Sequence, residues 1–278
     1  MKLCFNAGPD PIEDYFPFAH KNGFPWIELS CNSPVNFPAT FDAKRICRVK
    51  KLRDLYRVRY GVHSASYVNT AEIEPTVRKA VVEHLLDYVE LSRQLEAEYL
   101  VLHFGYHFSL FREEVLRCLI ETFTPVVERA EKVGIPIGIE NMNKVHDDCE
   151  IVYLGVTVEE MEPVFKALPS KFFGLTYDVA HASLLPDGMK AFVKAFPDRI
   201  VSVHLSDTDL LLDKHLPIGE GKIDFREALQ DLKEIGFDGV LNIELKDNPG
   251  RLLSKERLEP ILKELGVWEE VVNVGSSH

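Results

Sequence analysis

Short apolar segments recur along the chain and alternate with longer segments that have one apolar face. The short segments are rich in β-branched and aromatic residues, as buried strands are. In the longer segments apolar residues return every three or four positions, as Val77, Val81, Leu85 and Val89 do, which is typical of amphipathic helices. The pattern therefore predicts strands and helices in alternation.

The predicted strands begin 24 to 39 residues apart, which leaves room for one helix and two loops between parallel neighbours. They are Lys2–Asn6, Trp26–Ser30, Tyr60–His63, Tyr99–Phe104, Pro136–Glu140, Phe172–Asp178, Ile200–Leu205 and Gly239–Leu245. Eight such units close a (β/α)8 barrel, the TIM barrel, so the fold class expected is α/β. Because no linker rich in Pro, Gly or Ser divides the chain, we expect one barrel over residues 1–272. Residues 273–278 form a tail whose end resembles the remnant of a purification tag.

Composition narrows the class of protein. No apolar run approaches the roughly 20 residues of a membrane span, and the N-terminus lacks the apolar core of a signal peptide, so we expect a cytoplasmic protein without a membrane partner. The five cysteines are scattered without a Cys-x-x-Cys pair, which favours reduced thiols. A net charge of −12 repels polyanions and makes nucleic acid a less favoured partner.

Ionisable residues stand at the C-terminal ends of six successive predicted strands, from the third to the eighth. Strands of a barrel are buried on both faces, so a charged residue there needs a reason. Because parallel strands end at one rim, these side chains are expected to converge, and three carboxylates among three imidazoles resist burial unless a cation lies between them. The residues are His63, His103, Glu140, Asp178, His204 and Glu244. Such ligands suit zinc, manganese, cobalt or iron better than magnesium.

Further ligands are expected from two short motifs. Asp178 and His181 lie three residues apart across a strand-to-helix turn, close enough to serve one site. Asp213 and His215 follow the seventh strand and form either another pair of ligands or a solvated loop pair. For Glu28, on the second strand, an outward-facing structural role and a contact with substrate are equally expected.

The motifs resemble those of the xylose-isomerase-like TIM barrels, a group that includes sugar isomerases, sugar epimerases and endonuclease IV. The resemblance extends over nearly the whole chain, through VHSASY, YLVLHFG, GIEN, TYDVAH, VSVHLSD, HLPIGEGKIDF and NIEL in that order. By resemblance to the isomerases and epimerases, Glu140, Asp178, His204 and Glu244 hold one divalent metal (Mn, Co, Mg or Zn). Glu140 and Glu244 then act as the catalytic acid and base on a sugar, keto-sugar or sugar phosphate through a metal-stabilised enediolate, and His181 contacts a substrate oxygen.

Resemblance to endonuclease IV implies a rival function, because matching residue types exist for all nine ligands of its three zinc ions. They are His63, His103, Glu140, Asp178, His181, His204, Asp213, His215 and Glu244. A phosphodiesterase acting on abasic DNA is therefore the alternative. Against it stand the acidic net charge and segment 142–148, which lacks the glycine-rich DNA-contacting loop of the nuclease.

A third alternative is a barrel that binds a sugar or a protein without turnover. It is disfavoured because complete ligand sets are costly to keep together without a cation. We therefore expect a metal-dependent isomerase or epimerase with a small sugar as its partner, with one metal ion expected and up to three possible. A homo-oligomer is also possible.

Overall fold

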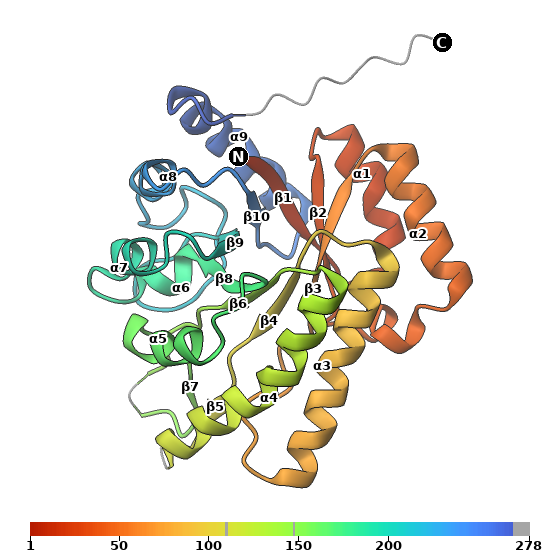
Figure 1. Cartoon of the computed structure of the whole chain (residues 1–278). Helices are drawn as coiled ribbons and strands as arrows, with labels where there is room; N and C mark the ends of the chain where they lie inside the picture. Colours follow the sequence, from red (N-terminus) through yellow and green to blue (C-terminus); the bar gives the residue numbers. More distant parts are fainter. Residues whose placement is uncertain (109–110, 147, 269–278) are drawn as a thin grey trace.

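The computed structural model describes residues 1–108, 111–146 and 148–268, and in it eight parallel strands close into a barrel (Figure 1). Around the barrel the strands follow the order β1, β10, β9, β8, β6, β4, β3, β2. Their bounds are β1 Lys2–Ala7, β2 Trp26–Ser30, β3 Arg59–His63, β4 Leu100–His103, β6 Ile137–Glu140, β8 Phe173–Asp178, β9 Ile200–Leu205 and β10 Val240–Ile243. The predicted (β/α)8 barrel is confirmed, with strand ends shifted by one or two residues. The predicted tail 273–278 lies outside the described residues.

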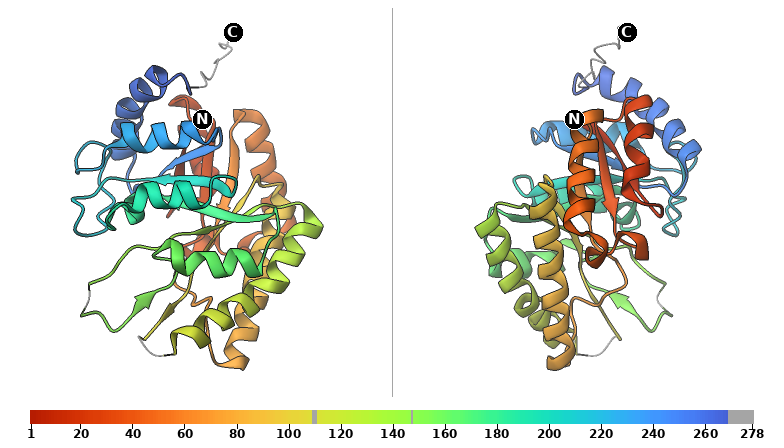
Figure 2. Two further views of the ribbon diagram at one scale, coloured as in Figure 1. Left: turned by 60° about the vertical axis from the view of Figure 1, so that its left-hand side comes forward. Right: turned by 90° about the vertical axis from the view of Figure 1, so that its right-hand side faces the viewer.

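Helices lie on the outside of the barrel, between successive strands (Figure 2). Asp42, Glu74, Asp224 and Asp247 cap four of them, each accepting a hydrogen bond from the backbone N–H three residues on. The helices are α1 Tyr15–Lys21, α2 Ala43–Tyr56, α3 Pro75–Leu95, α4 Arg112–Val133, α5 Val158–Ala167, α6 Val179–Ser183, α7 Gly188–Ala195, α8 Phe225–Glu234 and α9 Asn248–Glu264. None of the helices in the described part of the chain is long and apolar enough to cross a membrane.

A small sheet outside the barrel was not predicted. Strands β5 (Tyr106–His107) and β7 (Val152–Tyr153) pair antiparallel and join the loops that follow β4 and β6. Each has only two residues, too few for a periodic pattern to reveal.

The barrel interior is filled in layers by every second residue of each strand. An apolar cluster inside the barrel contains Cys4, Trp26, Tyr99, Val101 and Val240. Glycine is required at two other inward-facing positions, because a Cβ at Gly61 would lie 2.3 Å from the Tyr99 ring, and one at Gly138 would lie 2.1 Å from Thr176 Oγ1. Two residues further along these strands come His63 and Glu140, so the same alternation points both inward at the C-terminal rim.

Candidate metal centre

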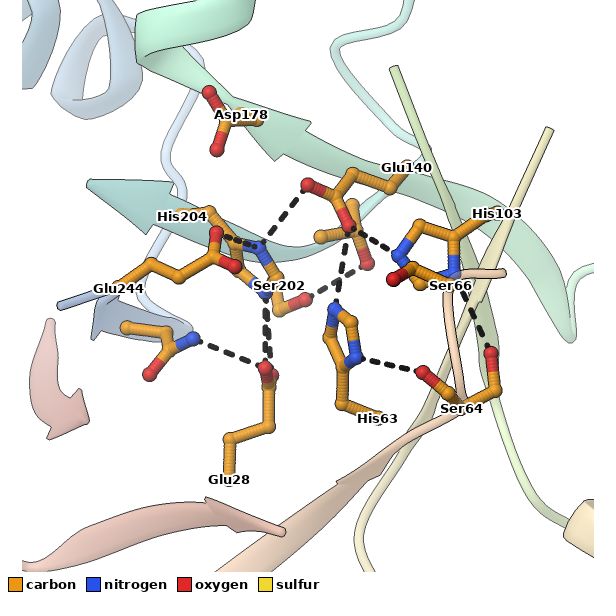
Figure 3. A network of polar contacts seen from close by, with 12 residues as sticks. Glu28, His63, Ser64, Ser66, His103, Glu140, Asp178, Ser202, His204 and Glu244 are labelled. Atoms are coloured by element: carbon orange, nitrogen blue, oxygen red, sulfur yellow. Dashed lines mark hydrogen bonds and ion pairs between the residues drawn. The ribbon is translucent and has the colours of Figure 1, made fainter. Parts of the chain in front are cut away.

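The structure brings all six predicted strand-end residues together inside the mouth of the barrel (Figure 3). Glu140 lies between the imidazoles: its Oε1 is 3.4 Å from His204 Nδ1, and its Oε2 is 3.4 Å from His63 Nε2 and 3.3 Å from His103 Nε2. Glu244 Oε2 is 3.2 Å from the same His204 Nδ1. Asp178 approaches the group from β8.

Four of these residues have the arrangement of a metal site. Ligand atoms of Glu140, Asp178, His204 and Glu244 all lie within 4.8 Å of one another. Each residue also has a buried atom for which the described residues provide no hydrogen-bond partner, namely Glu140 Oε2, Asp178 Oδ2, His204 Nδ1 and Glu244 Oε2. Buried polar atoms are normally paired, so this convergence of unpaired lone-pair donors fits a divalent cation.

Asp178 holds its position through the turn that follows it. Its Oδ1 accepts a hydrogen bond of 2.6 Å from the backbone N–H of His181 and thereby caps α6, which leaves Oδ2 for the centre. Asn141 ties the ends of β6 and β8 together, because its Oδ1 accepts from Asp178 N at 2.7 Å and its Nδ2 donates to Asp178 O at 3.0 Å. No role was expected for Asn141 from the sequence, although it stands in the GIEN motif.

A second group lies at the edge of the mouth. Asp213 Oδ2 is 3.3 Å from His181 Nε2 and 3.2 Å from His215 Nε2, and the ligand atoms of the three residues lie within 4.8 Å of one another. The interpretation of Asp213 and His215 as a solvated loop pair is therefore wrong. His63, His103 and Glu140 form a third group of this kind, which shares Glu140 with the first.

The charges of the centre shift the pKa values of its members. Burial, together with the nearby Glu140 and Glu244, raises the pKa of Asp178 to about 6. Burial acts to raise the pKa of Glu244 as well, but contact with His204 outweighs it and lowers that pKa to about 2. Burial acts to lower the pKa of His204, yet Glu28 and Glu140 hold it well above the ordinary value. In the absence of a metal, carboxylates thus gather around a protonated imidazole.

Glu28 also belongs to this group of side chains, although the sequence left its orientation open. Its side chain is completely buried inside the barrel and approaches His204 Nε2 to 3.1 Å, so the outward-facing alternative is wrong. A carboxylate between the apolar residues Ile27 and Leu29 was the only available signal.

A cavity of about 500 Å³ opens beside Glu244, between the loops that follow β1, β2 and β10. It is lined by Asn6, Gly8, Pro9, Ser30, Asn32, Ser33, His215, Glu244, Leu245 and Lys246. Buried Arg251 joins two of these loops, since its Nε donates to Leu245 O at 3.1 Å and its Nη2 lies 3.5 Å from Gly8 O. Arg251 therefore has a structural role.

Comparison with known proteins agrees with this architecture. A family model described as xylose isomerase-like TIM barrel matches residues 16–270, so the chain belongs to that family. The uncharacterized protein MJ1311 of Methanocaldococcus jannaschii is 38% identical over 237 residues, which are 83% of this chain and 76% of that protein.

Solved structures resemble the whole barrel. The crystal structure of a D-tagatose 3-epimerase-like protein has a TM-score of 0.86 and 33% identity, covering 96% of this chain and 98% of that one. The IOLI protein, solved with a bound zinc atom, has the same fold, with a TM-score of 0.79 and 18% identity over 95% of this chain and 99% of that one. Proteins named inosose isomerase, fructoselysine 3-epimerase and L-ribulose 3-epimerase also match most of the chain.

Proposed function

We propose that the protein is a divalent-metal-dependent epimerase or isomerase of a ketose or a related keto-sugar. The observation that carries the proposal is the placement of two carboxylates, Glu140 and Glu244, on either side of His204 Nδ1, at 3.4 and 3.2 Å. Proton transfer beside a carbonyl needs one group to remove a proton and another to return one. The similarity to a D-tagatose 3-epimerase-like protein supports this class of reaction.

Glu140, Asp178, His204 and Glu244 would hold the metal, as their unpaired atoms indicate. A divalent ion bound there would polarise the substrate carbonyl and stabilise the negative charge that develops when the neighbouring proton leaves. The pKa values of Glu140 and Glu244 are both lowered despite burial, chiefly by His204, so both carboxylates are ionised at neutral pH and able to accept a proton. Glu244 is 21% exposed and lines the cavity, whereas Glu140 is 3% exposed, so Glu244 is the more accessible to an entering substrate.

The cavity beside Glu244 has the chemistry of a sugar site. Asn6 Oδ1 and Asn32 Oδ1 already accept hydrogen bonds from Leu245 N and Ser66 N, so their NH2 groups are the donors left for substrate oxygens. Ser30, Ser33 and Lys246 add polar groups to the lining. A volume of about 500 Å³ accommodates a monosaccharide.

A multinuclear phosphodiesterase is the second candidate, and one observation favours it. All nine residues that match the ligands of endonuclease IV fall into three groups, two of which share Glu140. Several metals held in this way could activate water and stabilise a displacement at phosphorus. The net charge of −12 and the epimerase-like relative weigh against it.

Deuterium exchange tests the preferred function. The metal-loaded protein, incubated in deuterated water with ketohexoses including D-tagatose, is expected to place deuterium at the carbon beside the carbonyl. Glu140→Gln and Glu244→Gln should each lower turnover by about 100-fold or more because a proton-transferring group is lost. Glu220→Gln, at an exposed position, is the control and should retain activity. Cleavage of an abasic-site duplex, together with no exchange in any ketose or keto-sugar tested, would establish the second candidate instead.

A further inference from the structure

Glu28 is a buried carboxylate to which the proposed proton transfer assigns no task. It lies on β2 with no exposed surface, next to the apolar cluster that contains Trp26 and Tyr99. Burying a charge without a partner costs several kcal/mol, and an apolar side chain at this position would avoid that cost. The contacts of Glu28 therefore need an explanation beyond packing.

Three donors from three different strands or strand ends converge on Glu28. Tyr99 Oη donates to Oε2 at 2.9 Å, and Asn242 Nδ2 donates to Oε1 at 3.0 Å. His204 Nε2 lies 3.1 Å from Oε1 and 3.3 Å from Oε2 (Figure 3). A carboxylate has acceptors only, and both Glu28 oxygens already accept a hydrogen bond, so His204 Nε2 is placed to act as the third donor.

The opposite edge of the same imidazole faces the metal ligands. His204 Nδ1 is 3.4 Å from Glu140 Oε1 and 3.2 Å from Glu244 Oε2, and within the described part of the chain it makes no hydrogen bond. A proton fixed on Nε2 leaves the lone pair of a neutral imidazole on Nδ1, which is the nitrogen that a metal can bind. The position of the two carboxylates on one side and Glu28 on the other therefore selects the tautomer and the ring orientation together.

We propose that Glu28 is a positioning residue for the metal centre, holding His204 from inside the barrel so that Nδ1 is presented to the ion. The inference rests on the proposed metal-dependent function but concerns affinity for the ion, not turnover. A carboxylate on the far nitrogen of a metal-binding histidine also makes the near nitrogen more basic, and removal of such a partner typically weakens metal binding by about 10- to 100-fold.

Two substitutions separate the charge of Glu28 from its ability to accept a hydrogen bond. Glu28→Gln removes the charge but keeps one acceptor oxygen, so Co²⁺ affinity should fall by about 10-fold. Glu28→Leu removes the acceptor as well, and the fall should approach about 100-fold. Affinity is measured on the full chain by competition with a chelator, and the visible absorption spectrum of bound Co²⁺ reports whether the ligand geometry changes.

Ser202→Ala is the matched control. Ser202 lies two residues before His204 on β9, is fully buried, and shares a hydrogen bond of 2.9 Å with Thr176. Its removal disturbs the barrel interior without touching the imidazole, so it should lower thermal stability while Co²⁺ affinity stays within about threefold of the wild type. The melting temperature of each metal-free variant shows how much of any change in Co²⁺ affinity is due to a loss of structural stability.

The outcomes are distinguishable. If the wild-type protein binds no Co²⁺, the proposed function fails. If it binds Co²⁺ and a folded Glu28→Gln variant binds equally tightly with an unchanged spectrum, only the role of Glu28 fails. If the variants do not fold, nitrogen-15 NMR of histidines in the zinc-loaded wild type decides: a proton on His204 Nε2 supports the proposal, and a proton on Nδ1 overturns it.

Discussion

The two carboxylate oxygens of Glu140 face two different groups of side chains. Oε1 faces His204 at 3.4 Å and His181 Nδ1 at 3.7 Å, whereas Oε2 faces His63 and His103 at 3.4 and 3.3 Å. Burial lowers the pKa of His103, so this imidazole is neutral and able either to bind an ion or to support Glu140. The number of metal ions per chain depends on which of these it does.

We expect His103→Ala to leave the number of bound metal ions unchanged at one per chain, because the four-ligand group does not include His103. Elemental analysis of protein purified without added metal measures this number. His84→Ala, on α3 and packed against Tyr88, is the control. Two or three ions in the wild type, with one lost in His103→Ala, would contradict the prediction and favour the phosphodiesterase.

At the scale of elements, the loop between β9 and α8 is organised around one buried side chain. Asp207 Oδ2 accepts hydrogen bonds from Gly219 N at 2.8 Å and Gly221 N at 2.9 Å, and Oδ1 accepts one from Ile223 N at 3.1 Å. A backbone bridge also pairs Asp207 with Leu216. These contacts fold the loop back so that Asp213 and His215, which lie between its ends, reach His181.

Replacing Asp207 by Asn should lower the free energy of unfolding by about 1–3 kcal/mol, since an amide NH2 would face backbone N–H donors in a buried position. Chemical denaturation measures the change. Glu220→Gln alters an exposed residue of the same loop and should change stability by less than about 0.5 kcal/mol. Equal stability of the two variants would show that Asp207 does not organise the loop.

How much the sequence predicts differs between elements. The barrel strands follow from apolar runs at regular spacing, and the strand-end residues follow because parallel strands share one rim. The separation of Asp178 and His181 across one turn predicted their proximity, and His181 Nδ1 lies 3.7 Å from Asp178 Oδ1, although the two residues belong to different groups of candidate ligands. The orientation of Glu28 could not be predicted, because the direction of a side chain within a strand depends on register with its neighbours, and Glu28 is set opposite Asn6 and Gly61 only once the barrel closes. The loop from Asp207 depends likewise on long-range hydrogen bonds that no local pattern encodes.

For the whole molecule, the centre concentrates charged groups inside the mouth of the barrel. Burial opposes ionisation there, but Glu28 and Glu140 hold the pKa of His204 well above its usual value. In the metal-free protein, the stability contributed by this raised pKa is complete below about pH 6.5 and is lost as the pH rises through the folded-state pKa. Because a metal ion binds the neutral imidazole, the stabilisation that the ion provides increases as the pH rises over this range.

A bound metal ion should therefore raise the melting temperature, and the increase should be larger at about pH 8 than at about pH 6. An ion present at about 100 times its Kd stabilises the folded state by about 2.7 kcal/mol. Scanning calorimetry in the presence of Zn²⁺ or of EDTA measures the difference in melting temperature between the two conditions. Asp178→Asn, which lacks one charged ligand, should show a smaller difference. A melting temperature independent of metal at both pH values would contradict the prediction.

The close packing of Gly61 against the Tyr99 ring limits how this barrel can be redesigned. A Cβ at position 61 would overlap that ring, whose hydroxyl reaches Glu28 and through it His204. Any larger residue there would displace this ring and disturb its contact with Glu28, even though position 61 does not line the cavity. Libraries made to change substrate preference should therefore vary the loops that line the cavity and keep glycine at position 61.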